Sequence, residues 1–306
     1  MEMGKNMSEQ AAKKIRLKGH ETFILREGWL AKGIRAVADN PKVFSEYSGA
    51  DALGVGTNMA KAIRYWLKAS GLTEENKNGV ELSSLGRIVM AYDSYFEDRF
   101  TLWILHACIA CNSELATSWY VFFNMIGYEE YTREELLYTL NRELCVYSGQ
   151  NELSESSVAA DVTAIINMYS RDKSSDYDPE EKKLSPFAEL GLLKRDNKSV
   201  RKQTPAAEDE LGYAVFYLIN RYFEIYKTDS VAIDKLLHDE ELPGRIFNLN
   251  RVELNFYLDK LAANEYIVVN RTAGLDMVYS IKAMNSQEVV KMYYLKRQEL
   301  LRNKDR

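Results

Sequence analysis

Few side chains in this 306-residue chain have types and spacing that could do chemistry. Cys108 and Cys111 form a Cys-x-x-Cys pair, a spacing that can bind metal or exchange thiols, and His106 lies nearby. The pair lies in an apolar segment without a second pair, so we expect two buried small side chains. The other histidines, His20 and His238, lie in different segments without metal-ligand spacing. We therefore predict no catalytic residue, no metal site and no cofactor.

Two further patterns resemble motifs that bind nucleotides or metals. The Gly-Val-Gly at 54–56 begins like a dinucleotide-binding loop, but the third glycine is absent and the preceding residues predict a helix instead of the required strand. The acidic cluster with a lysine at 178–182 faintly resembles metal-dependent nucleases. It lies in the polar run 171–186, which is typical of a linker and offers no strand to hold the carboxylates. Neither pattern is given a functional role.

The stretch 49–72, GADALGVGTNMAKAIRYWLKASGL, has the strongest functional signal. It predicts a short helix, a turn and a longer helix, the order of a helix-turn-helix, because Gly54 and Gly56 allow backbone angles that other residues resist. Apolar residues recur at helical spacing, which leaves a polar and basic outward face that would contact phosphates or base edges of DNA. The candidate DNA-binding residues on this helix are Thr57, Asn58, Lys61, Arg64, Tyr65 and Lys68. The alternative is a solvated face of a purely structural helix.

An N-terminal helix-turn-helix unit over 19–98 surrounds this stretch. Residues 1–18 predict a flexible lead, and the helix that follows ends near Asn40-Pro41. After the candidate helix, we expect a polar turn, an extended piece at 80–82 and another helix capped by Ser83 or its neighbour.

A central helical domain is predicted over 99–192. The segment 101–126 is apolar nearly all round and is broken at 112–114, which is typical of buried helices. Thr132 followed by Glu135 is a capping-box signature for the next helix.

Residues 193–210 change from basic to acidic and predict a linker to a C-terminal winged-helix-like unit over 211–306. This unit has a helix capped by Asn250 and then two strands joined by a turn at 271–274. Arg271 in this turn is the last candidate DNA contact, although the mixed charges of the capped helix favour protein contact or solvation. The predicted fold is mostly α: a helical multi-unit protein with an N-terminal helix-turn-helix (winged-helix-like) element, a central helical bundle and a C-terminal winged-helix-like unit with a small β-hairpin.

Composition and charge limit the function classes. Hydrophobic residues make up 46% and charged residues 28%, which is ordinary for a globular protein. The net charge of −5 and the pI near 5.5 give no global positive field, so DNA binding needs a local patch and favours a subunit that binds DNA in company. Three cysteines, no signal peptide and no membrane-spanning run predict a cytoplasmic protein without membrane contact. The oligomeric state stays open.

Four stretches carry a family resemblance: HETFILREGWLAKGIRAV from His20, LGVGTNMAKAIRYWLKASGL from Leu53, EDRFTLWILHACIACNSELATSWYVFFN from Glu97, and SPFAELGLL from Ser185. On these residues the chain resembles the domain-of-unknown-function 4007 family of bacteria and archaea, from about His20 into the C-terminal unit. The resemblance implies no catalytic motif. It implies genes for phosphoadenosine-phosphosulfate-reductase-like proteins and cysteine desulfurases as neighbours, in islands that resemble DNA phosphorothioation and phage-defence systems.

The basic helix face and the resemblance lead to one hypothesis. The chain would be a non-catalytic accessory subunit of a DNA phosphorothioation or phage-defence system that binds double-stranded DNA. It would present the DNA to, or regulate, a phosphoadenosine-phosphosulfate-reductase-like sulfur-transfer enzyme. The alternatives are a protein-interaction scaffold built on the aromatic-rich helices, and a transcriptional regulator of the defence operon.

Overall fold

The protein is mostly helical, with three small antiparallel sheets in the part of the chain that the structure describes. The computed structural model describes residues 13–45, 49–170, 184–196, 198–272, 274–282 and 284–304. One continuous core of buried apolar residues extends from Leu25 in the N-terminal part to Tyr294 near the C-terminus. No helix among the described residues is long and apolar enough to cross a membrane.

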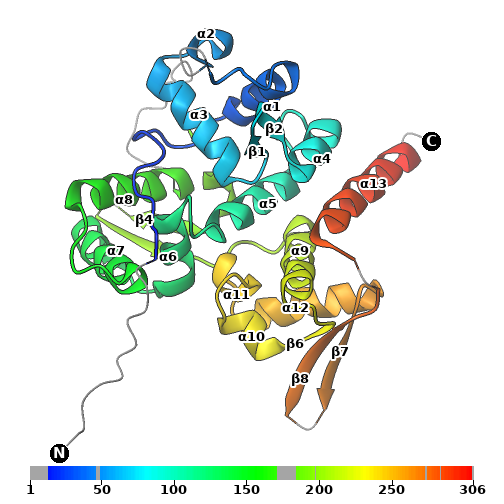
Figure 1. Ribbon diagram of the computed structural model, residues 1–306. Helices are drawn as coiled ribbons and strands as arrows, with labels where there is room; N and C mark the ends of the chain where they lie inside the picture. The colour runs from blue at the N-terminus through cyan, green and yellow to red at the C-terminus, as the bar shows by residue number, and fades with distance from the viewer. Residues whose placement is uncertain are drawn as a thin grey trace, which may run out of the picture.

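The N-terminal part folds around a short helix, a turn and a longer helix (Figure 1). A β-hairpin follows the longer helix, and the Val80 N–H of its second strand also donates to the Pro41 carbonyl at 2.8 Å. Ser83 caps the next helix by accepting from the Gly86 N–H, as its sequence position predicts. The elements are α1 (Trp29–Asp39), α2 (Ala50–Leu53), α3 (Thr57–Ala69), β1 (Thr73–Asn76), β2 (Gly79–Leu82) and α4 (Ser84–Tyr92).

The central part contains the most deeply buried helices. The apolar segment divides into two helices at the predicted break, and the capping box of Thr132 and Glu135 is present. The elements are α5 (Arg99–Ala110), α6 (Thr117–Met125), β3 (Tyr131–Thr132), α7 (Arg133–Ser148), α8 (Glu155–Tyr169), η2 (Pro186–Leu190), β4 (Leu193–Asp196) and β5 (Ser199–Lys202).

The C-terminal part combines a long aromatic-rich helix with a three-stranded sheet. Asn250 caps the helix Arg251–Ala263 by accepting from the N–H groups of Val252 and Glu253. The elements are α9 (Asp209–Tyr226), β6 (Ser230–Ala232), α10 (Ile233–His238), α11 (Pro243–Ile246), α12 (Arg251–Ala263), β7 (Ile267–Thr272), β8 (Leu275–Ser280) and α13 (Ser286–Lys304).

The central and C-terminal parts share one topology that no sequence period indicates. Each has a helix, a short strand, further helices and then a hairpin whose last strand pairs with the short first strand. The sheet orders are β3-β5-β4 and β6-β8-β7, which correspond strand for strand. β3 is only two residues long, too short for a recognisable alternating pattern.

The predicted linker at 193–210 is wrong over its first half, because Leu193–Asp196 and Ser199–Lys202 form β4 and β5. Leu193, Val200 and Lys202 are buried, and the charges interleaved with them concealed the strand pattern. The predicted linker at 171–186 lies almost wholly outside the described residues.

The described end of the predicted flexible lead, residues 13–18, is held against the central helices. The Arg16 N–H donates to Thr117 Oγ1 at 3.0 Å, and the Lys18 N–H donates to Asp161 Oδ1 at 2.9 Å. Backbone bonds to distant polar side chains leave no local sequence signal, which explains why this contact was not predicted. Residues 1–12 lie outside the described part.

The C-terminal helix α13 packs on α9 of its own part and also contacts α4 of the N-terminal part (Figure 1). The ring of Tyr293 stacks on Phe100 with centroids 3.9 Å apart, and its hydroxyl donates to Asp98 Oδ1 at 3.0 Å. Arg297 forms an ion pair with the same buried carboxylate. These contacts hold the C-terminal helix against the start of α5, 195 positions away from Tyr293 in the sequence.

Candidate nucleic-acid interface

The turn between α2 and α3 fixes the direction of the candidate helix. Gly54 ends α2 in a left-handed conformation with φ 59°, and a Cβ there would meet no atom within 4 Å. The glycine is therefore required for its backbone angle and not for space. Gly56 follows in an extended conformation as the N-cap of α3.

The buried side of α3 is anchored by a cluster of aromatic rings and one histidine. Trp66 is fully buried and its Nε1–H donates to the Phe23 carbonyl at 3.0 Å. The His20 ring stacks on Trp66 with centroids 5.9 Å apart, and its Nε2 lies 2.9 Å from Asp161 Oδ1 of α8. The same buried carboxylate accepts from Ser118 Oγ at 2.5 Å. This network fixes α3 to the central helices, and it gives His20 a structural role.

The outward side of α3 carries most of the predicted polar residues. Thr57, Asn58 and Lys61 are exposed, and Arg64 and Lys68 are partly exposed. Their spacing places them along one side of the helix.

The prediction that Tyr65 lies on the outward face of α3 is wrong, because this residue is buried with 6% of its surface exposed. Its hydroxyl donates to the Leu115 carbonyl at 3.0 Å. Tyr65 lies at the edge of the outward stripe, where the segment between α5 and α6 covers it. Helical periodicity shows which residues share a face, but it does not show which distant segment covers that face.

In the described part of the chain, no side chain caps the first turn of α3. Gly56 provides no side-chain cap, and no acidic residue lies in this turn. Gly56, Thr57 and Asn58 are exposed, so their neighbourhood is open to a ligand. The N–H groups of a first helical turn carry a partial positive charge and bind anions readily.

A carboxylate in the hairpin offsets part of the basic surface of α3. Glu75 of β1 pairs with Arg64 Nη2 and with Lys68 Nζ, each at 3.0 Å. Burial by itself would raise the pKa of Glu75, but the hydrogen bond from Lys68 and the charge of Arg64 lower it overall. Lys61 has no carboxylate partner among the described residues. Glu75 is a residue of this surface that the sequence does not reveal, because its polar run indicates only a turn.

The surface formed by α12 and β7 in the C-terminal part differs in charge and polarity from the outward side of α3. Arg271 on β7 donates to Asp259 Oδ1 at 2.8 Å and to Asn255 Oδ1 at 3.0 Å. Arg251 pairs with Asp234 at 3.1 Å. Helix α12 also exposes apolar side chains, with 75% of the surface of Val252 and 42% of that of Phe256 exposed. The cations here are balanced by aspartates, and the remaining surface is partly apolar.

The remaining sequence candidates occupy structural positions. Cys108 on α5 and Cys111 at the C-cap of this helix are free thiols, and burial raises the pKa of both. His106 is fully buried between the Tyr169 hydroxyl and the Ile246 carbonyl, both at 2.8 Å, and burial lowers its pKa to about 4. No three His, Cys, Asp or Glu side chains of the described residues lie close enough together to hold a metal ion. The acidic cluster at 178–182 is outside the described part.

Solved structures with the same overall fold exist. The crystal structure of SspB and a magnesium ion-bound crystal structure of SspB each match with a TM-score of 0.78 and 25% sequence identity. In both comparisons the match covers 94% of this chain and 89% of the SspB chain.

The comparison with curated proteins gave no match. The family comparison confirms the resemblance seen in the sequence: the model of DUF4007, a protein family of unknown function, matches residues 17–294. The chain belongs to the DUF4007 family.

Proposed function

We propose that the chain is a non-catalytic DNA-binding subunit that contacts double-stranded DNA with the outward side of α3. The observation that carries the proposal is the basic stripe of Lys61, Arg64 and Lys68 beside an open helix N-terminus and a β-hairpin. A helix-turn-helix followed by a hairpin is the arrangement of a winged helix, in which the second helix enters the major groove. The hairpin of β1 and β2 would then be the wing.

The cations of α3 would have different roles in this contact. Lys61 has no carboxylate partner among the described residues, so it can approach a phosphate without losing an ion pair. Arg64 and Lys68 share Glu75, and a phosphate would compete with that carboxylate. The first-turn N–H groups would donate to a further phosphate. Because the whole chain has a net charge of −5, we expect modest affinity from this patch alone.

The C-terminal unit would contact a protein. Its helix and strand order also fits a winged helix, but the exposed Val252 and Phe256 of α12 suit an apolar interface better than a phosphate backbone. Arg271 stays a candidate DNA contact, which the single variant Arg271→Glu tests. The family resemblance favours a phosphoadenosine-phosphosulfate-reductase-like enzyme as the partner. Co-purification with that enzyme after nuclease treatment tests this role, and loss of the complex on nuclease treatment would show a bridge of DNA instead.

Magnesium has no role in this proposal. One of the SspB structures holds a magnesium ion, but the described residues of this chain offer no cluster of three metal-ligating side chains. No step is therefore assigned to a divalent cation.

The decisive experiment measures duplex DNA affinity as a function of salt concentration. We expect Lys61→Glu/Arg64→Glu to weaken binding by about a hundredfold at low salt and to make the logarithmic salt dependence shallower by about two units. The control Lys235→Glu/Arg251→Glu changes the net charge equally on the C-terminal unit and should lose far less affinity. Melting curves of both variants exclude unfolding as the cause. Equal losses in the two variants would contradict a contact on α3.

A further inference from the structure

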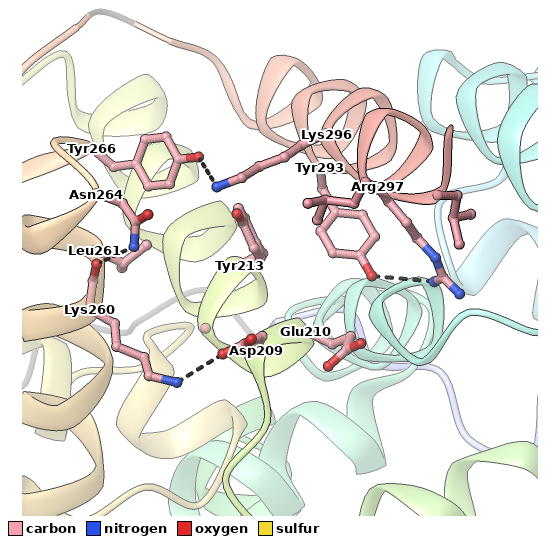
Figure 2. A pocket seen from close by; sticks show the side chains of 13 residues that line it. Asp209, Glu210, Tyr213, Lys260, Leu261, Asn264, Tyr266, Tyr293, Lys296 and Arg297 are labelled. Carbon is pink, nitrogen blue, oxygen red and sulfur yellow. Dashed lines mark hydrogen bonds and ion pairs between the residues drawn. The ribbon is translucent and has the colours of Figure 1, made fainter. Parts of the chain in front are cut away.

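A cavity of about 640 Å³ lies between α9, α12 and α13, away from the outward side of α3 (Figure 2). Its volume falls within the range of about 300–1,000 Å³ that is usual for small-molecule sites. Its wall contains three tyrosines, Tyr213, Tyr266 and Tyr293, together with Lys296 of α13. Aromatic rings beside a cation are the groups that bind bases and phosphates.

Lys296 is the cation whose charge is least balanced in this cavity. Its Nζ donates to the Tyr266 hydroxyl at 3.3 Å, and it lies 5.7 Å and 5.6 Å from the ring centroids of Tyr213 and Tyr266. The hydroxyl of Tyr213 raises the pKa of Lys296, so the ammonium form is favoured. Among the described residues no carboxylate forms an ion pair with it. Two neutral hydroxyls hold the ammonium in place and leave its charge available to an anion.

The other two cations of the cavity are paired with carboxylates, and Glu210 adds a further carboxylate to its lining. Lys260 pairs with Asp209 at 2.8 Å, and Arg297 pairs with Asp98. Figure 2 shows Asp209 on the opposite side of Tyr213 from Lys296. The cavity therefore has an anion-binding end at Lys296 and an end with carboxylates that can accept hydrogen bonds.

The surface between these two ends is apolar. The ring of Tyr213 meets Tyr293 edge to face with centroids 5.1 Å apart, and Leu261 adds an aliphatic wall. Leu300 and Leu301 on α13 also line the cavity, with 56% and 53% of their surfaces exposed. Exposed leucines beside aromatic rings provide a surface on which a planar base can pack.

We propose that this cavity binds one nucleotide unit, with its phosphate on Lys296 and its base against Tyr213 and the leucines. The carboxylate end would accept hydrogen bonds from base amino groups. The ligand is either a free mononucleotide or one nucleotide of single-stranded DNA, since both present the same base and phosphate. The site is separate from the duplex contact on α3.

The test uses the full chain and calorimetric titration with deoxyadenosine monophosphate. We expect saturable binding, with inorganic phosphate and deoxyadenosine each at least about tenfold weaker, because each lacks one half of the ligand. Lys296→Met should weaken nucleotide binding by about tenfold or more, the loss of one charge-assisted hydrogen bond. The matched control Lys291→Met removes an exposed lysine of the same helix that does not line the cavity, and it should bind like the wild type.

Further arms separate the two sources of the nucleotide. If the ligand is a DNA strand, a short single-stranded oligonucleotide will bind more tightly than the mononucleotide and will lose affinity in Lys296→Met. If it is free, the mononucleotide will bind at least as well as the strand. Absence of saturable binding by both, equal binding of inorganic phosphate, or equal losses in the two lysine variants would overturn the proposal. Lys61→Glu/Arg64→Glu should leave mononucleotide binding intact, so this site and the duplex site can fail independently.

Discussion

Two helices that each precede a β-hairpin, α3 in the N-terminal unit and α12 in the C-terminal unit, present opposite kinds of surface. α3 buries its aromatic residue Trp66 and exposes cations, of which Lys61 has no carboxylate partner in the described part of the chain. α12 exposes the aromatic residue Phe256, while its cation Arg251 pairs with aspartates. The two helices therefore differ in charge and polarity, although the elements around them follow a similar order. The proposal that α3 contacts DNA and α12 contacts a protein rests on this difference.

The largest expected effect is a difference in stability between alanine variants of Trp66 and Phe256. Trp66→Ala should lower the free energy of unfolding by about 3–5 kcal/mol, because a fully buried indole and its hydrogen bond to Phe23 are lost. Phe256→Ala should cost less than about 1 kcal/mol, because much of the ring already lies in water. Urea denaturation monitored by far-UV circular dichroism measures both free energies of unfolding, without relying on tryptophan fluorescence. A large loss in Phe256→Ala would show that α12 is covered, for example by another copy of the chain.

Lys202 in the central part is a buried cation, unlike the exposed cations of α3 and α12. Lys202 Nζ donates to the carbonyls of Phe123 and Ile126 at 3.0 and 2.7 Å, at the C-terminal end of α6. Burial foremost, and then the charge of Arg245, lower its pKa to about 7. An unfolded lysine has a pKa of about 10.4, so between these two values the unfolded chain binds more protons than the folded chain.

Stability should therefore rise as pH increases through this window, and the penalty for burying the charge should be fully present below pH 7. We expect a gain of about 1 kcal/mol between pH 7 and 8. Above this range the buried thiols of Cys108 and Cys111, whose pKa is raised by burial, oppose the gain because the unfolded thiols lose their protons first. Denaturant titrations at a series of pH values measure the slope. Lys202→Met should remove it, whatever its effect on stability at one pH, and a flat wild-type profile would contradict the assignment.

The sequence predictions are correct for features set by neighbouring residues and fail for features set by contacts between residues far apart in the sequence. The capping box of Thr132 and Glu135 and the turn at Gly54 are local, and both were predicted correctly. The burial of Tyr65 depends on Leu115, fifty positions away, and that of Lys202 on the end of α6. No local pattern contains such contacts, so the stripe on α3 was predicted in outline but not at its edge. The repeated topology was not predicted either, because the first strands of the two sheets, two and three residues long, leave almost no periodic signal.

A variant of Glu75 gives the smallest expected effect and the most specific test of the difference between α3 and α12. This carboxylate pairs with Arg64 and Lys68, which are both partly exposed, so its charge subtracts from the proposed DNA surface. Glu75→Gln keeps a similar shape and a hydrogen-bond acceptor but removes the charge. We expect it to strengthen duplex binding by about three- to tenfold at low salt, while stability changes by no more than about 1 kcal/mol, as for other exposed ion pairs.

The matched control for this prediction is Asp259→Asn on α12, which releases Arg271 and changes the net charge by the same amount. If α3 is the DNA surface, this variant should leave duplex affinity within about twofold of the wild type, because long-range charge is screened beyond about 10 Å at moderate salt. An equal gain in both variants would mean that net charge alone sets the affinity. A gain confined to Asp259→Asn would move the DNA contact to the C-terminal unit, where Arg271 was predicted to act. Salt titrations of the two variants, run side by side, distinguish these outcomes, because only an added phosphate contact steepens the salt dependence.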